Sequence, residues 1–295
     1  MRYLVLVNPL SHGGRAGRRW REFADMLPDA KFIELKTIDE GRELARTATD
    51  YETIVACGGD GTVNAIADGV MANPDESLKF GVIYQGTSPD FCTFHGIPTE
   101  PKDACRLLQE GTVRCIPVLQ ANGHCFFCSC NLGMGATVAA RANRLRPTFG
   151  DKLGTFLALL SALFASPSYD ITVNGESLDR CGHLLVTRMP YIASGLKLQL
   201  PPLADDEFAL WSVREMSLFR WLAMLPKLYR GEPCGDVRIC RSSLRVASAS
   251  SIDVEYDGDP HGSLPLDISF APRRLKLVAN GIPDLGNGSK CLSSH

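Results

Sequence analysis

The sequence has no run of about 20 apolar residues, the length that a membrane-spanning helix requires. It also has no excess of basic residues, because 31 Lys and Arg are balanced by 33 Asp and Glu, for a net charge of −2. This balance argues against nucleic acid as the main partner. The apolar start of the chain reaches Asn8-Pro9 after a few residues, which is too short for a secretory signal peptide. We therefore expect a cytoplasmic protein with no transmembrane segment and no nucleic-acid partner.

A zinc site is also not predicted, although the chain has 11 cysteines. Cys125, Cys128 and Cys130 follow His124 closely. If this segment is one strand, the side chains of Cys125 and Cys128 point to opposite faces, and no second Cys/His pair follows at zinc spacing. In a reducing compartment we expect the cysteines to be free thiols packed among strands.

The composition is that of a globular protein, with 45% hydrophobic and 22% charged residues, and the 295 residues suffice for two domains. Up to about residue 120, strand-like segments alternate with helical ones, which predicts a doubly wound parallel sheet. The predicted strands are Arg2–Val7, Lys31–Leu35, Thr53–Cys57 and Phe80–Tyr84, and the predicted helices between them are Glu40–Ala48 and Val63–Val70.

After about Gly123 the pattern changes to short strands, most of them without a helix between. This predicts a second, mainly antiparallel domain. The fold class is therefore α/β, with a nucleotide-binding domain over residues 1–120, to which the chain returns at 272–285, and a β-sandwich-like domain over 121–271. The predicted strands of the second part are Cys125–Cys130, Tyr169–Val173, His183–Thr187, Leu196–Leu200, Ala209–Val213, Leu244–Ala247, Ser251–Tyr256, Leu264–Phe270 and Leu275–Val278.

Three glycines within four positions mark the turn between the third strand and the helix after it. The segment reads Gly58-Gly59-Asp60-Gly61-Thr62. Without Cβ atoms, this backbone lets an anion approach closely, with N–H groups and the helix N-terminus directed at it. Asp60 would hold a Mg²⁺ against phosphates or take a proton from an attacking hydroxyl. The alternative is an ordinary strand–helix turn with a capping Asp.

Two further loops follow strands of the same predicted sheet. Asn8–Gly14 comes after the first strand, and Gln85–Phe91 comes after the fourth. Ligands of parallel α/β sheets bind at the carboxyl ends of the strands, so we expect all three loops to lie at one binding edge.

Two carboxylates, Asp257 and Asp259, flank a glycine directly after a predicted strand. One of them could bind a metal or orient a substrate while the other takes a proton. An ordinary turn is the alternative.

Two helical segments of the second part allow two interpretations each. Leu153–Phe164 is strongly apolar, and we expect a buried helix or one wall of a lipid-binding cleft. Ser217–Tyr229 is amphipathic with Trp221 and basic residues. It is expected to cap a core, and the alternative is a helix that lies on a membrane surface.

The order of these motifs resembles that of the bacterial diacylglycerol-kinase-like lipid kinases, the group that also includes sphingosine kinases. The resemblance extends from Arg2 to about Val278. It implies ATP and Mg²⁺ as cofactors and an active site between an α/β domain and a β-sandwich-like domain. The motifs that carry it are Asn8-Pro9, Ser11, Gly13, Gly58-Gly59-Asp60-Gly61-Thr62, Gly86-Thr87, Asp90-Phe91, Asn131-Leu132-Gly133-Met134-Gly135-Ala136 and Asp257-Gly258-Asp259.

The resemblance also implies roles for individual residues. Asp259 takes the position of the family's proton acceptor, with Asp257 and Asp60 as the other catalytic carboxylates. A structural Mg²⁺ would be held by the Asp206 side chain and the carbonyls of Leu203 and Phe208. The implied nucleotide-binding residues are Asn8, Pro9, Leu10, Ser11, His12, Thr37, Gly58, Gly59, Asp60, Gly61, Thr62, Val63, Asn64, Ala65 and Thr87.

We therefore predict an ATP-dependent lipid kinase that transfers the γ-phosphate to a lipid hydroxyl such as that of diacylglycerol. The lipid would be taken from the membrane surface, and a homodimer is left open. Two alternatives remain. One is a kinase that acts on a soluble hydroxyl substrate, including NAD. The other is a member that binds nucleotide or lipid without turnover, because Pro89 and Ala65 differ from the residues usual in the family.

Overall fold

The computed structural model of the chain describes residues 2–14, 16–133, 168–192 and 196–280, with a few single residues between 138 and 161. The chain forms two compact units. The first comprises Met1–Val118 and the segment from Ala271 onward, and the second comprises Leu119–Phe270. Most of the predicted Leu153–Phe164 helix and the segment 193–195 lie outside the described residues.

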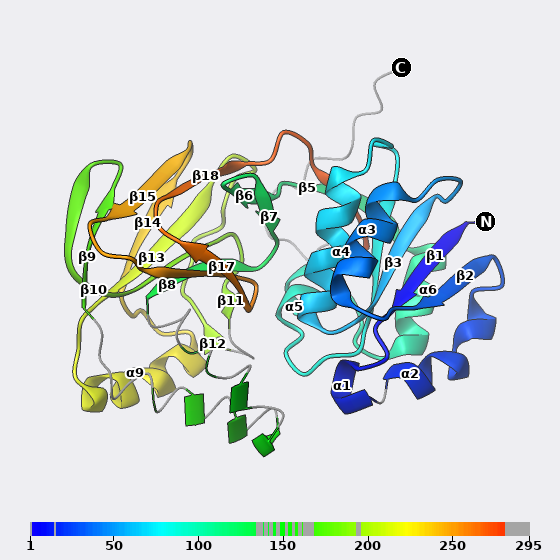
Figure 1. The fold of residues 1–295 in the computed structure, drawn as a ribbon, viewed down its shortest axis with the longest axis horizontal. Coiled ribbons are helices and arrows are strands. Elements are labelled where there is room, and N and C mark those ends of the chain that lie inside the picture. The colour runs from blue at the N-terminus through cyan, green and yellow to red at the C-terminus, as the bar shows by residue number, and fades with distance from the viewer. Residues whose placement is uncertain are drawn as a thin grey trace. The chain divides into compact units, whose positions relative to one another are not determined.

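The first unit is built on a six-stranded sheet in the order β2-β1-β3-β4-β19-β5 (Figure 1). All neighbouring pairs are parallel except β19 and β5. The helices lie in the connections between the strands. The elements are β1 (Tyr3–Val7), α1 (Ser11–Gly14), α2 (Ala16–Arg19), η1 (Trp20–Glu22), η2 (Ala24–Met26), β2 (Ala30–Glu34), α3 (Ile38–Thr47), β3 (Thr53–Gly58), α4 (Asp60–Ala72), β4 (Lys79–Tyr84), α5 (Asp90–His95), α6 (Pro101–Glu110), β5 (Thr112–Ile116) and β19 (Leu275–Ala279).

The inner strands of this sheet are continuous apolar runs because both faces are covered. All five residues of β1 and all six of β3 are buried. One core cluster combines residues of β1, β3 and β4 with Phe23, Leu27 and Leu108 from the connecting segments and α6. The predicted doubly wound parallel sheet is confirmed.

The second unit is dominated by an 11-stranded antiparallel sheet. Its main order is β17-β16-β8-β10-β9-β15-β18-β6-β7, and β13 pairs with both β10 and β14. The elements are β6 (Leu119–Ala121), β7 (His124–Phe126), β8 (Ser129–Gly133), β9 (Tyr169–Val173), β10 (Glu176–Thr187), β11 (Tyr191–Ile192), β12 (Leu196–Lys197), β13 (Phe208–Arg214), α9 (Leu218–Arg230), β14 (Asp236–Cys240), β15 (Leu244–Ser248), β16 (Asp253–Tyr256), β17 (Asp259–Ser263) and β18 (Leu266–Phe270).

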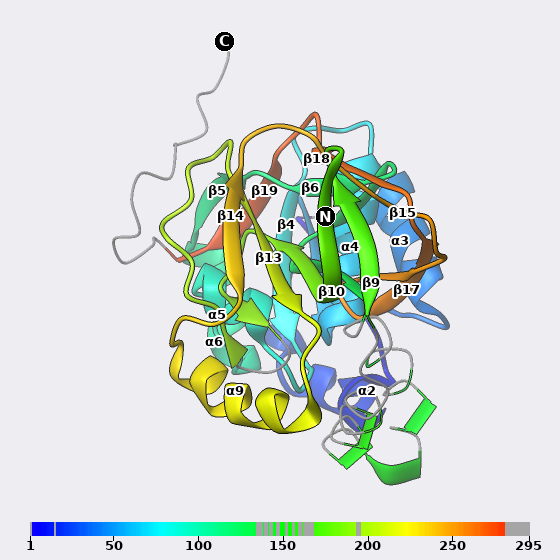
Figure 2. The ribbon, with the colours of Figure 1, turned by 90° about the vertical axis from the view of Figure 1, so that its left-hand side faces the viewer.

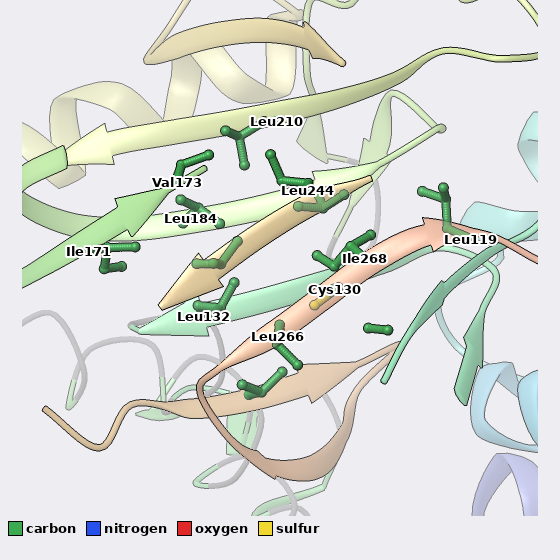
Figure 3. Packing of buried hydrophobic residues seen from close by; sticks show 14 of the residues in the cluster. Leu119, Cys130, Leu132, Ile171, Val173, Leu184, Leu210, Leu244, Leu266 and Ile268 are labelled. Carbon is green, nitrogen blue, oxygen red and sulfur yellow. The ribbon is translucent and has the colours of Figure 1, made fainter. Parts of the chain in front are cut away.

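The sheet curls around one apolar core. Figure 3 shows Leu132, Ile171, Leu184, Leu210 and Ile268, which come from five different strands, within this core. Because side chains alternate along a strand, the other face of the sheet needs its own cover. The helix α9 supplies it (Figure 2), packing Trp221, Met224 and Leu228 against Leu185, Leu198, Trp211 and Val213. The predicted mainly antiparallel second domain is confirmed.

Several details differ from the expectations. The predicted strand Leu196–Leu200 extends only over Leu196–Lys197, as β12. The predicted strand Cys125–Cys130 is two strands, β7 and β8, with a bend at Phe127 and Cys128. The strand-alternation argument against a zinc site therefore does not hold for Cys125 and Cys128. Cys115 is in a disulfide bond, so the expectation of free thiols was wrong at this residue. The other described cysteines are free.

Candidate functional site

The glycine-rich turn between β3 and α4 lies against the loop that follows β4. A Cβ atom on Gly58 would lie 2.6 Å from the side chain of Thr62. A Cβ on Gly86 would lie 2.7 Å from the Cα of Gly59, closer than real Cβ contacts come. The two loops are joined by a hydrogen bond of 2.7 Å from the Gln85 N–H to the Gly58 carbonyl. Glycine is therefore required at Gly58 by the Thr62 side chain and at Gly86 by the close approach of two backbones.

The loop after β1 joins the same turn. The Asn8 side-chain amide donates to the Thr62 hydroxyl oxygen at 2.8 Å, and the Gly59 N–H donates to the Ser11 hydroxyl oxygen at 3.2 Å. The loops after β1, β3 and β4 thus meet at the carboxyl edge of the parallel sheet, where such folds bind ligands. Sequence reasoning placed these three loops together, and the structure shows the contacts between them.

Asp60 is the first residue of α4, and its carboxylate is oriented by Tyr84. The Tyr84 hydroxyl donates to Oδ2 of Asp60 at 2.7 Å and accepts the Ser88 N–H at 2.9 Å. Burial, followed by the negative charge of Asp60, raises the pKa of Tyr84, so the hydroxyl stays protonated and remains a donor. Sequence analysis did not identify Tyr84. Its position at the end of β4, directly before the loop, was the only available signal.

Other predicted nucleotide-binding residues lie at or near this edge but differ in what their side chains can reach. The side chains of Val63, Asn64 and Ala65 are 2%, 6% and 2% exposed. They point into the core, so a ligand contact from them would use backbone N–H groups. Leu10 and Thr87 are exposed, Pro9 contacts Gly17, and His12 and Gly61 lie in the first turns of α1 and α4.

Thr37 lies after β2, the neighbour of β1, and has a local structural role. Its hydroxyl accepts the Glu40 N–H at 3.1 Å, and the Glu40 carboxylate accepts the Lys36 N–H at 2.6 Å. These two hydrogen bonds cap the N-terminus of α3, with Thr37 as the N-cap residue. The contact with a nucleotide that the resemblance implies stays a prediction.

Two buried polar side chains of this region, those of Gln85 and Asn64, have amide atoms with no hydrogen-bond partner in the described part of the chain, both atoms in Gln85 and Oδ1 in Asn64. Gln85 lies in the loop after β4. Its side chain is 3% exposed, yet neither atom of its amide makes a hydrogen bond within the described residues. A buried amide is normally satisfied by protein, water or ligand. This amide, in the loop that contacts the glycine turn, fits a polar ligand such as a nucleotide.

In the second unit, the Asp257-Gly258-Asp259 turn connects β16 to β17. The Asp257 carboxylate accepts three backbone N–H groups, those of Phe127, Cys128 and Ser129, at 2.7–2.8 Å. Burial raises the pKa of Asp257 to about 6, although these donors favour the charged form. Asp257 therefore holds the bend between β7 and β8 against the turn. Asp259 is half-buried as the first residue of β17.

Glu255, two residues before Asp257, was missed by sequence analysis. It is 4% exposed on β16 and accepts the Asn131 side-chain amide at 2.8 Å as well as the Gly258 N–H. Burial raises its pKa to about 8, and the neighbouring Asp257 and Asp259 contribute to that rise. Glu255 thus ties the glycine of the turn to β8, and it belongs to a group of three carboxylates in which charge is costly.

The loop predicted to hold a structural Mg²⁺ faces two arginines. The Arg188 guanidinium donates to the carbonyls of Ala204 at 3.1 Å, Asp205 at 3.2 Å and Glu207. Arg241 pairs with the Glu207 carboxylate at 2.7 Å, and Glu207, with a smaller contribution from the exposed Asp206, raises the pKa of Arg241. The carbonyls of Ala204, Asp205 and Glu207 are therefore engaged by guanidinium groups. The oxygen atoms implied as Mg²⁺ ligands, those of Leu203, Asp206 and Phe208, are not among these acceptors, and the Mg²⁺ site stays a prediction.

Comparisons with known proteins agree with this architecture. The family model of the diacylglycerol kinase catalytic domain matches residues 2–121, and that of the YegS C-terminal NAD kinase beta sandwich-like domain matches residues 128–279. The chain belongs to the diacylglycerol-kinase-like lipid kinase family. The two matches of this family meet near the junction of the two compact units.

Individual members of the family are similar over most of their length. A "Probable lipid kinase YegS-like" of Alcanivorax borkumensis is 27% identical over 84% of this chain and 86% of that protein. A diacylglycerol kinase of Bacillus subtilis is 26% identical over 78% of each. The crystal structure of a diacylglycerol kinase from Bacillus anthracis has a TM-score of 0.73 at 19% identity, covering 95% of this chain and 97% of that one. This last likeness shows the fold.

The helices of the structure can be compared with the requirements of a membrane-spanning segment. None of the described helices has the length and hydrophobicity needed to cross a bilayer.

Proposed function

We propose that the chain is an ATP-dependent lipid kinase that transfers the γ-phosphate to a lipid hydroxyl of the diacylglycerol class. The observation that supports this most strongly is the meeting of the β1, β3 and β4 loops around Gly59. At that point Gly59 and Gly86 pack backbone against backbone, and α4 begins directly after Gly59. The N-terminus of a helix favours an anion such as a phosphate chain. The names of the relatives supply the lipid as acceptor.

Asp60 is the residue that would hold Mg²⁺ in this proposal. One carboxylate combined with substrate phosphates is a usual donor set for this ion, and Tyr84 fixes the orientation of the carboxylate. When bound, Mg²⁺ supplies neutralisation of the charge on the transferring phosphoryl group.

The proposed proton acceptor is Asp259. As the lipid oxygen bonds to the γ-phosphorus, its proton passes to the Asp259 carboxylate. The bond between the γ-phosphorus and the oxygen that bridges it to the β-phosphate breaks, and ADP leaves. Backbone N–H groups of the glycine turn would stabilise the charge that spreads over the γ-phosphate oxygens. Asp257 and Glu255 would position Asp259 by holding the turn.

A second candidate acceptor is NAD, because the matched model of the second domain carries the NAD kinase name. The test is transfer of labelled phosphate from ATP to a panel of lipids with free hydroxyls and, in parallel, to NAD, with Asp60→Asn as the inactive control. We expect label in a lipid only. Label in NAD alone would select the second candidate. ATP binding without transfer to any acceptor would indicate a member that binds without turnover.

A further inference from the structure

The helix α9 carries an exposed apolar face that its packing leaves uncovered. Trp221, Met224 and Leu228 are buried against the sheet. Phe219, Leu222 and Tyr229 are 81%, 41% and 64% exposed. Residues three, seven and ten positions apart lie on one side of a helix, so these side chains form a strip with Pro226 away from the buried face. The helix lies at the periphery of the second unit (Figures 1 and 2).

Basic side chains border this strip, and the helix carries no acidic one. Arg220, Lys227 and Arg230 follow the same seven- and three-residue spacing, one position further along than Phe219, Pro226 and Tyr229. Arg230 pairs with Glu232 just beyond the helix at 2.5 Å. Within the described chain, Arg220 and Lys227 have no ion-pair partner. The helix Leu218–Arg230 therefore has a charge of +3 in a chain whose net charge is −2.

A further cation and a stable helix end complete this surface. Lys197 on β12 lies beside Gly231, with 3.3 Å between its Cδ and the position of a Gly231 Cβ. Gly231 ends α9 in the left-handed conformation with a φ of 67°, and its N–H donates to the Leu228 carbonyl. The basic end of the helix is thus fixed in place.

We propose, on the basis of the lipid-kinase function above, that the outer face of α9 docks on a membrane surface that contains anionic lipids. An interfacial helix needs an apolar face with aromatic side chains and a bordering basic strip, and α9 has both. Phe219, Leu222 and Tyr229 would enter the boundary between headgroups and acyl chains. Arg220, Lys227 and Lys197 would contact the phosphates of the lipid headgroups. Docking would bring the enzyme to the surface that contains its acceptor.

The test measures binding of the full chain to vesicles by co-sedimentation. Vesicles of phosphatidylcholine with added phosphatidylglycerol are compared with phosphatidylcholine alone. The test variants are Phe219→Ser with Tyr229→Ser, and Arg220→Glu with Lys227→Glu. The matched controls change exposed residues elsewhere, Val237→Ser with Ile239→Ser on β14, and Lys31→Glu with Lys102→Glu on the first unit. All these side chains are exposed, so the melting temperature should not change.

We expect the wild type and both controls to bind the anionic vesicles. Both α9 variants should bind them at least about tenfold more weakly, since each basic residue near an anionic surface contributes a several-fold effect. High salt should weaken binding of the wild type more than that of the Arg220→Glu, Lys227→Glu variant, which lacks these charges. Equal binding of all variants, or no binding of the wild type, would overturn the proposal. A change in oligomeric state of the Ser variant without a change in vesicle binding would also overturn the proposal. It would indicate that the outer face of α9 binds a second copy of the chain.

A second readout separates this proposal from the proposed function. With a short-chain diacylglycerol dispersed as monomers, the α9 variants should transfer phosphate as fast as the wild type, and they should be slower only on vesicles. If no lipid accepts phosphate while vesicle binding still depends on α9, the kinase function fails and the docking surface stands. If transfer occurs and is the same on vesicles for all variants, the docking surface fails and the kinase function stands.

Discussion

At the scale of single residues, Asp60 and Tyr84 form the pair on which the proposed phosphate site depends. Replacing Asp60 by Asn should abolish transfer, because the neutral amide cannot hold Mg²⁺ as a carboxylate does. Tyr84→Phe keeps the ring and removes the 2.7 Å hydrogen bond to Asp60. We expect a loss of about tenfold to 100-fold in kcat with a smaller change in KM, since the carboxylate loses its orientation but not its charge.

The measurement is a steady-state kinase assay of both variants with thermal melts as controls. Both proteins should stay folded, because Asp60 is half-buried and Tyr84→Phe keeps the buried ring. An Asp60→Asn enzyme with wild-type turnover would remove Asp60 from the mechanism, and a collapsed melting transition would assign it to the fold instead.

Glu255 should make the stability of the protein depend on pH. Its pKa is about 8 in the folded chain, against an ordinary value of 4.5. Between these pH values the folded state keeps a proton that the unfolded state releases. The free energy of unfolding should therefore fall as pH rises from about 5 to 8, on the order of 1 kcal/mol per pH unit. Asp257, with its pKa raised to about 6, adds to this in the lower part of the range.

Urea unfolding at a series of pH values checks this, with Glu255→Gln as the matched variant. Gln cannot ionise and keeps an oxygen that accepts the Gly258 N–H. The variant should lose most of the slope between pH 6 and 8. Parallel curves for the two proteins would show that Glu255 does not titrate in this range.

At the scale of elements, the positive charge beside the 203–208 loop comes from Arg188 and Arg241 of the same chain. Three of the loop's carbonyls accept from Arg188, and Arg241 pairs with Glu207. These two guanidinium charges disfavour a further cation at the loop, so a chelator should leave the melting temperature unchanged. Arg188→Ala should destabilise the protein by about 1–3 kcal/mol, because these acceptors lose a charged donor. Arg241→Ala, which breaks an exposed pair with Glu207, should cost less than about 1 kcal/mol.

Thermal melts with and without EDTA, on the wild type and both variants, test this account of the loop. A fall in the wild-type melting temperature on chelation, restored by Mg²⁺, would show that Leu203, Asp206 and Phe208 hold a metal despite the arginines.

At the scale of the whole molecule, the sequence predicted those strands and turns whose pattern lies within a few consecutive residues. The strands β1, β3 and β4 are uninterrupted apolar runs, and the glycine turn follows one of them directly. Exposed or short elements were missed, such as β14, in which every residue except Cys240 is exposed, and β17. The β17 sequence, Asp259 to Ser263, has no apolar alternation. The β14 sequence alternates over only four residues, with Val237 and Ile239 as its apolar positions, which is a short signal.

The candidate site was predictable to the same extent. Loop positions such as Asn8, Gly59 and Asp60 were predictable, because each belongs to a short motif that directly follows a predicted strand. Residues that act through distant partners gave no sequence signal: Glu255 bonds to Asn131, 124 positions away, and Tyr84 reaches Asp60 across 24 residues. Such pairings are set by sheet register, here Glu255 opposite Asn131 on β16 and β8, which the sequence does not reveal.

The central claim is that one chain binds ATP on the first unit and uses Asp259 of the second as the base. The most direct measurement is the rate of phosphate transfer to diacylglycerol for the wild type, Asp259→Asn and Asp259→Glu, with ATP affinity measured on the same proteins. We predict a measurable wild-type rate and a loss of about 100-fold or more in Asp259→Asn at unchanged ATP affinity, within the range for a general base. ATP binding without any transfer, in the wild type and Asp259→Glu alike, would contradict it.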